Sequence, residues 1–169
     1  MRTLATERLA LTRLSARDAE FIYGQLNEPS FLHFIGDRGV HSVEDAHRYI
    51  NDGPVAMYAR YGYGLLRVSL KADDTPIGIC GVLKRDSLPE PDLGFSLLPA
   101  YWSKGYAFEA ANAVMREAHG TLGLKRILAI TSQDNESSIK LLGKLGFRFE
   151  QLIRHGEDTN ELRLFASES

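Results

Sequence analysis

The segment from residue 92 to residue 131 constrains the fold most, because it reads as a strand, a helix and a second strand in succession. Residues 92–98 (DLGFSLL) and 126–131 (RILAIT) are apolar runs of strand length. Between them small apolar residues recur at helical spacing, at Ala107, Ala110, Ala111, Val114 and Ala118. A β-α-β unit joins its strands in parallel by a right-handed crossover. The segment therefore predicts one parallel strand pair.

The rest of the chain predicts antiparallel strands and further helices around this unit. A first helix, opened by Ser15, is expected to end at Pro29, and a second, opened by Ser42, is expected to stop near Gly53 and Pro54. A helix capped by Asn135 follows the second strand of the unit. Further strands are expected near 9–14 and over 64–70, 76–84, 147–153 and 161–166. The order β-α-α-β-β-β-α-β-α-β-β predicts an α/β fold of the α+β type, with helices on both faces of a mixed, mostly antiparallel sheet.

Size, charge and cysteine content exclude several classes of protein. The 169 residues suit one domain, 1–169. With 20 Lys and Arg against 22 Asp and Glu, the net charge of −2 argues against direct nucleic-acid binding, which depends on neutralising phosphates. Cys80 is the one cysteine, and neither it nor the scattered histidines predict a metal site. We expect Cys80 to be a small core residue rather than a nucleophile.

No targeting or membrane segment is expected. The first ten residues lack the apolar core of a secretion signal. No apolar run approaches the roughly 18 residues that a membrane span needs. We therefore expect a cytoplasmic protein that does not bind membranes.

The join between strand 92–98 and the next helix carries the chemistry. Pro99 lacks an N–H and ends the strand, while Gly105 and Ala107 are small residues at the start of the helix. A helix N-terminus has free N–H groups and the positive end of the dipole, so it favours an anion such as phosphate. The alternative is a plain strand-to-helix turn with nothing bound. The GxxxxGK[ST] spacing of a P-loop is absent.

Two motifs in order make the chain resemble a known family. YWSKGYAFEA at 101–110 is followed by N-x-x-S-x-x-L-x-x-x-G-F from Asn135 to Phe147. This arrangement resembles the GNAT-type N-acetyltransferases, which use acetyl-CoA. The segments TERLALTRLSARDA, SVEDAHRYI and LGFSLLPAYWSKGYAFEA look more narrowly like the RimJ/RimL-like branch. The likeness runs from about Thr6 to Phe165.

The resemblance implies where acetyl-CoA binds. The family's pyrophosphate loop falls on Trp102, Ser103, Lys104, Gly105, Tyr106 and Ala107. Trp102 stands where many members have Gln or Arg, so the backbone N–H groups should provide most of the contacts. The family also splays the strand at 92–98 from the strand at 126–131, and the pantetheine arm pairs in the gap like an added strand. Leu97 and Leu98 would supply that backbone, and Asn135 would meet the arm from the other side.

The resemblance also implies the catalytic groups. The residue three after Asn135 points toward the thioester sulfur in this fold, so Ser138 becomes the candidate proton donor to the thiol. Many members use a Tyr further along this helix, and none occurs here between 135 and 147. The alternative for Ser138 is a local cap partner of Asn135. Family members often carry a carboxylate just before the Gly-aromatic pair of the central strand, so Asp92 is the candidate base. Its alternative is a solvated acid at the strand end.

The expected function is direct acetyl transfer from acetyl-CoA to a primary amine. For the RimJ/RimL-like branch the first expectation is the N-terminal α-amine of a protein. A small amine such as a polyamine, amino acid or antibiotic, or a non-catalytic acyl-CoA-binding module, are the alternatives. Residues 28–63 should hold the acceptor but carry no readable specificity code, and the protein could be a monomer or a homodimer. Glu109 is interpreted as an exposed charge on the helix, with orientation of neighbouring groups as the alternative.

Overall fold

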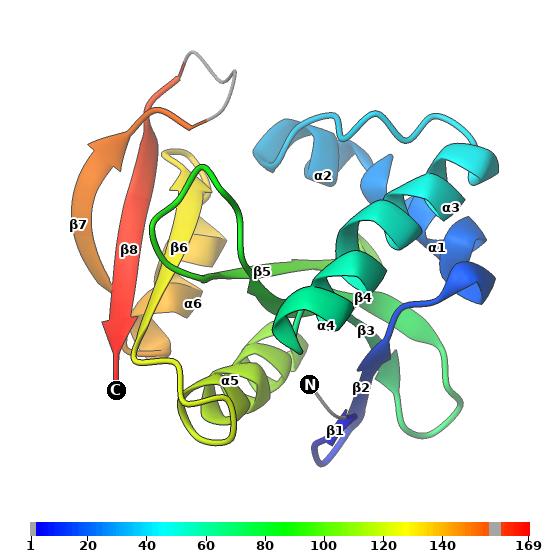
Figure 1. Ribbon diagram of the computed structural model, residues 1–169, viewed down its shortest axis with the longest axis horizontal. Coiled ribbons are helices and arrows are strands. Elements are labelled where there is room, and N and C mark those ends of the chain that lie inside the picture. Colours follow the sequence, from blue (N-terminus) through cyan, green and yellow to red (C-terminus); the bar gives the residue numbers. More distant parts are fainter. Residues whose placement is uncertain (1–2, 156–159) are drawn as a thin grey trace.

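The computed structural model describes residues 3–155 and 160–169 and contains an eight-stranded sheet in the order β1-β2-β3-β4-β5-β6-β8-β7 (Figure 1). The strands are β1 (Leu4–Ala5), β2 (Leu9–Arg13), β3 (Leu65–Leu70), β4 (Pro76–Leu83), β5 (Asp92–Leu97), β6 (Arg126–Ser132), β7 (Arg148–Ile153) and β8 (Leu162–Glu168). Every neighbouring pair is antiparallel except β5 and β6, which are parallel. The predicted mixed sheet with one parallel pair is confirmed.

Helices cover both faces of this sheet, as predicted. They are α1 (Ala19–Leu26), α2 (Pro29–Phe34), α3 (Val43–Ile50), α4 (Ala56–Tyr61), α5 (Tyr106–His119) and α6 (Glu136–Lys144). The first three share a core with Leu65 and Ile79 on one face. On the opposite face α5 packs its alanine stripe against Cys80, Leu93 and Leu97, because small side chains allow the helix to lie close to the strands. No helix in the described part of the chain is long and apolar enough to cross a membrane.

The two prolines expected to end helices differ in outcome. The first helix, α1, does end before Pro29, at Leu26, but Pro29 also begins α2, since the first position of a helix needs no hydrogen bond from its own nitrogen. The helix α3 does not stop near Gly53 and Pro54. It runs into α4 through one wider π-helical turn, Asn51–Val55, which accommodates the missing N–H of Pro54.

The parallel pair opens almost as soon as it forms. Asp92 and Leu128 are the only paired residues of β5 and β6 among those described, and the N–H of Leu128 bonds the carbonyl of Pro91 at 2.8 Å. Figure 1 shows β6 turning steeply away from β5 beyond this point. On its other side β6 pairs with β8 along its whole length. The sheet therefore has an opening between the carboxyl-terminal halves of β5 and β6.

Candidate active site

The loop from β5 to α5 lies at one end of this opening. Ser103 and Gly105 both have left-handed backbone angles, with φ of 60° and 82°. Gly105 is the N-cap of α5, and the described part of the chain shows no side-chain cap hydrogen bond at this helix start. A helix start of this kind presents N–H groups and the positive end of the dipole. All six residues predicted to form the pyrophosphate loop, 102–107, lie at this junction, so the geometry suits an anion held mainly by backbone.

Leu97 and Leu98 differ in which way their backbone faces. The N–H of Leu98 bonds Ile77 of β4 at 2.8 Å, and its carbonyl accepts from Tyr101 at 2.9 Å. Adjacent residues of a strand turn these groups to opposite sides. Leu97 therefore faces the opening, where its carbonyl accepts a hydrogen bond from the indole N–H of Trp102 at 2.9 Å. A carbonyl oxygen has a second lone pair, so Leu97 retains an acceptor and an N–H for a ligand.

Across the opening, the N-terminus of α6 is capped as the sequence predicted. Oδ1 of Asn135 accepts a hydrogen bond from the backbone N–H of Ser138 at 3.3 Å. The cap thus uses the Ser138 nitrogen, and the described part of the chain gives its hydroxyl no hydrogen-bond partner. Ser138 is partly buried whereas Ser137 is exposed. The helix cap therefore leaves the Ser138 hydroxyl unused.

Asp92 lies where β5 and β6 part. It is 1% exposed, and both carboxylate oxygens accept hydrogen bonds from the guanidinium of Arg85. The alternative of a solvated strand-end acid is therefore wrong. Burial raises the pKa of Asp92, and the hydrogen bonds and charge of Arg85 act against that rise. Asp92 is a buried acid beside the opening whose proton affinity depends on Arg85.

A second interpretation is also wrong, because Glu109 is not an exposed helical charge. Its side chain is 18% exposed and lies against the turn between β1 and β2. Oε1 accepts from Nε of Arg8 at 2.7 Å, and Oε2 accepts from the backbone N–H of Arg8 at 2.9 Å. The hydroxyl of Thr6 donates to Oε2 at 2.5 Å. About 100 residues separate these partners, so no local sequence pattern could have identified the cluster.

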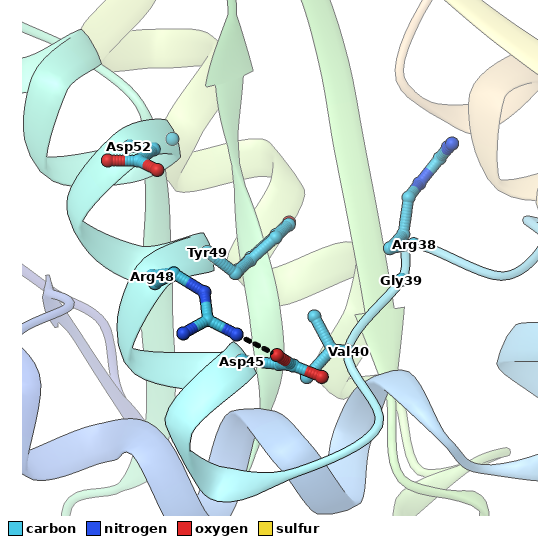
Figure 2. A pocket seen from close by; sticks show the side chains of 8 residues that line it. Arg38, Gly39, Val40, Asp45, Arg48, Tyr49 and Asp52 are labelled. Carbon is cyan, nitrogen blue, oxygen red and sulfur yellow. Dashed lines mark hydrogen bonds and ion pairs between the residues drawn. The ribbon is translucent and has the colours of Figure 1, made fainter.

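A pocket of about 360 Å³ lies beside α3 and is lined by Arg38, Gly39, Val40, Asp45, Arg48, Tyr49, Asp52 and Gly53 (Figure 2). Arg48 pairs with Asp45, whereas Arg38 extends away from that pair. Burial raises the pKa of Tyr49, and the charges of Arg38 and Arg85 act against that rise. Tyr49 therefore lines the pocket and is also close enough to Arg85, the partner of Asp92, to interact with its charge.

One further contact joins the two sides of the site. Nε2 of His33 in α2 lies 2.9 Å from Oδ2 of Asp134, the residue before the Asn135 cap. The sequence indicated only a surface histidine, and both side chains are indeed more than half exposed. The contact brings α2 to the start of α6.

Cys80 lies in β4, and its side chain is fully buried in the hydrophobic core. Burial raises the pKa of its thiol. A thiolate nucleophile needs partial exposure and a nearby positive group. The site therefore contains no activated cysteine at this position.

Comparison with known proteins places the chain in a family. Residues 8–148 match the Acetyltransferase (GNAT) domain. The chain is 29% identical over 153 residues to the uncharacterized N-acetyltransferase YoaA of Bacillus subtilis, covering 89% of this chain and 85% of YoaA. It is 30% identical over 161 residues to the uncharacterized N-acetyltransferase p20 of Bacillus licheniformis, covering 93% of this chain and 88% of p20.

Solved structures share the fold. An acetyltransferase from Agrobacterium tumefaciens superposes with a TM-score of 0.85 at 25% identity, over 100% of this chain and 95% of that one. RimL, a ribosomal L7/L12 alpha-N-protein acetyltransferase in complex with coenzyme A, gives 0.81 at 14% identity, over 98% and 96% of the two chains. MccE, a microcin C7 self-immunity acetyltransferase in complex with acetyl-CoA and AMP, gives 0.79 at 17% identity, over 97% and 94%. The chain belongs to the GNAT family of acetyltransferases and is an N-acetyltransferase of that family.

Proposed function

We propose that this protein transfers the acetyl group of acetyl-CoA directly to a primary amine, most readily the N-terminal α-amine of a protein. The observation that carries the proposal is the opening between β5 and β6, with the glycine-capped N-terminus of α5 at the end of β5. Small residues, and a helix start whose N–H groups are not bonded by a capping side chain, suit a pyrophosphate. The backbone of Leu97 would bind an amide of the pantetheine arm, and Asn135 would approach the arm from the α6 side.

The residues present fit such a donor. Within residues 3–155 and 160–169, Nη2 of Arg8, at 3.3 Å, is the one atom within 4 Å of the position that a Cβ of Gly105 would take, so the helix start is open to a ligand. Lys104 adds a positive charge to the loop. On β6, the strand that parts from β5, Thr131 has a buried hydroxyl. This hydroxyl has no hydrogen-bond partner among the described residues. Polar groups therefore lie on both strands that border the opening.

Acetyl transfer requires a neutral amine, a stabilised oxyanion and a leaving thiolate. The amine nitrogen forms a bond to the carbonyl carbon, the carbon–sulfur bond breaks, and the amine loses a proton. Ser138 would donate a hydrogen bond to the departing sulfur. Asp92 would take the amine proton through water, once substrate loosens its pairing with Arg85.

The strength of base that the reaction needs depends on the acceptor. At pH 7 roughly a tenth of α-amines, with pKa near 7.8, are neutral, against about one lysine in 2,500. Even with its pKa raised by burial, a carboxylate is a weak base compared with an amine, so Asp92 suits an α-amine better than a lysine. This preference agrees with a RimJ/RimL-like role. RimL acts on a protein α-amine, whereas MccE confers immunity to microcin C7, so a small amine is the second candidate.

Release of CoA tests the proposal. The protein is incubated with acetyl-CoA and peptides that differ in their first residue, alongside polyamines, amino acids and aminoglycosides. We expect release with peptides whose N-terminus is free, and none with matched peptides whose N-terminus is already acetylated. Tight binding of acetyl-CoA without release for any acceptor would indicate a non-catalytic acyl-CoA-binding module instead.

A further inference from the structure

The turn between β1 and β2 contacts the loop that would bind the donor. Arg8 lies at this turn, and Nη1 donates to the carbonyl of Lys104 at 3.0 Å. Its guanidinium carbon lies 4.3 Å from the centre of the Tyr106 ring, within range of a cation–π contact. Arg8 therefore touches the residues immediately before and after Gly105.

Glu109 holds Arg8 in this position. Its two oxygens accept from Nε and the backbone N–H of Arg8, at 2.7 and 2.9 Å, and from the hydroxyl of Thr6. Burial would raise the pKa of Glu109, but hydrogen bonds from Thr6 and Arg8 and the charge of Arg8 outweigh it and hold the pKa below its ordinary value. The carboxylate is thus ionised at neutral pH and fixed by three donors.

An ionised Glu109 has an electrostatic consequence for the loop. It lies in the first turn of α5, where its N–H bonds the carbonyl of Gly105 at 3.1 Å. A negative charge there stabilises the helix but repels a phosphate that approaches the same N–H groups. Arg8 cancels that charge at a distance of 2.7 Å. Without Arg8 the helix start would present its N–H groups beside an unbalanced carboxylate.

We propose that Arg8, held by Glu109, is a positioning residue for the pyrophosphate loop. It fixes the carbonyl of Lys104, so that the left-handed turn at Gly105 directs the N–H groups of α5 at the donor's phosphates, and it neutralises Glu109. The inference rests on the proposed function and adds a requirement for residues outside the loop. A plain fastening of the β1–β2 turn to α5 is the competing interpretation.

A donor that lacks the pyrophosphate separates these interpretations. Arg8→Ala should weaken CoA binding about tenfold by calorimetric titration, and raise KM for acetyl-CoA by a similar factor with little change in kcat. With S-acetylpantetheine as donor, kcat/KM should stay within about twofold of wild type. Arg8→Lys keeps the charge but lacks the planar fork that reaches Glu109 and Lys104 together, so it should recover only part of the affinity.

Arg126→Ala is the matched control. Arg126 pairs with Glu150 at 2.5 Å and Glu168 at 2.9 Å at the far side of the sheet, and its loss should leave CoA binding unchanged. The inference is overturned by equal losses with acetyl-CoA and S-acetylpantetheine, by full affinity in Arg8→Ala, or by an equal loss in Arg126→Ala. Failure of the wild type itself to bind CoA would overturn the proposed function, and this inference with it.

Discussion

The two sides of the opening are built in different ways. On the side proposed to bind the donor, backbone geometry dominates: Gly105 and Ser103 turn the chain, and Leu97 presents its backbone to the gap. On the side proposed to bind the acceptor, the pocket beside α3 is shaped by charged side chains such as Arg38 and the Asp45–Arg48 pair. Binding of a ligand by backbone groups tolerates side-chain substitutions, whereas the shape and charge of a pocket lined by side chains change when those side chains are substituted. The family's motifs lie on the first side, and we expect the choice of acceptor to depend on the second.

The sharpest test of the donor side is Gly105→Glu. A side chain at φ of 82° is strained, and a carboxylate there would occupy the helix start and repel phosphate. We expect CoA affinity to fall about 100-fold or more, corresponding to ~2.7 kcal/mol. Calorimetric titration of the folded variant measures the loss.

Gly123→Glu is the control for backbone strain. Gly123 also has a positive φ, of 65°, and a Cβ there would meet no atom within 4 Å. It should lose similar stability and keep its affinity for CoA. Unchanged affinity in Gly105→Glu would place the phosphates elsewhere.

The next effect in size concerns the far wall of the donor site. Ser138→Ala should lower kcat about 10- to 100-fold, a loss of ~1.4–2.7 kcal/mol of transition-state stabilisation, with little change in CoA affinity. The effect should be moderate because a CoA thiolate leaves tolerably without a proton donor. Steady-state kinetics with saturating acetyl-CoA measure it.

Ser137→Ala serves as the control, because Ser137 is exposed and lies about 100° around the helix from Ser138. A larger loss in Ser137→Ala than in Ser138→Ala would show that position 138 is only part of the helix cap.

Local patterns explain which parts of this molecule were predictable. The Asn135 cap and the Ser42 cap were identified from side-chain spacing and are confirmed, because capping depends on residues three apart. The helix that begins at Pro29 was missed and Pro54 was wrongly expected to stop a helix, because a proline also fits a helix start or a widened turn. The opening at Asp92 was expected only from resemblance to a family. The partners of Glu109 lie about 100 residues away in the chain, so only the fold brings them together.

On the acceptor side we expect a smaller effect of a different kind. Arg38→Ala should leave CoA affinity unchanged and raise KM about three- to tenfold for acceptors that carry a carboxylate close to the reacting amine. Arg38 has no ion-pair partner among the described residues, so its charge is available to such a group. Kinetics with paired acidic and neutral peptides test this. An equal change for both peptides would show that the pocket does not select by charge.

The smallest effect on activity is expected for Cys80→Ala. Direct transfer requires no acetyl-enzyme, and burial raises the pKa of this thiol, so it stays protonated at neutral pH. We expect kcat/KM within about twofold of wild type and no acetylated wild-type protein by intact-mass measurement. A chemically competent acetyl-enzyme at Cys80, or a large loss of activity in the folded variant, would contradict direct transfer.

Cys80→Ala should lower the free energy of unfolding although it leaves activity almost unchanged. Removal of the sulfur from a fully buried position leaves a small cavity and should cost about 1 kcal/mol in denaturant unfolding. In the unfolded chain this thiol has a pKa of ~8.5 and begins to ionise near that pH. Because burial raises the pKa of Cys80 in the folded protein, the folded state keeps the thiol protonated at the same pH. Wild-type stability should therefore decline more steeply above about pH 8.5 than that of Cys80→Ala. Parallel pH profiles would show that the thiol ionises equally readily in the folded state, and that β4 does not exclude water from it.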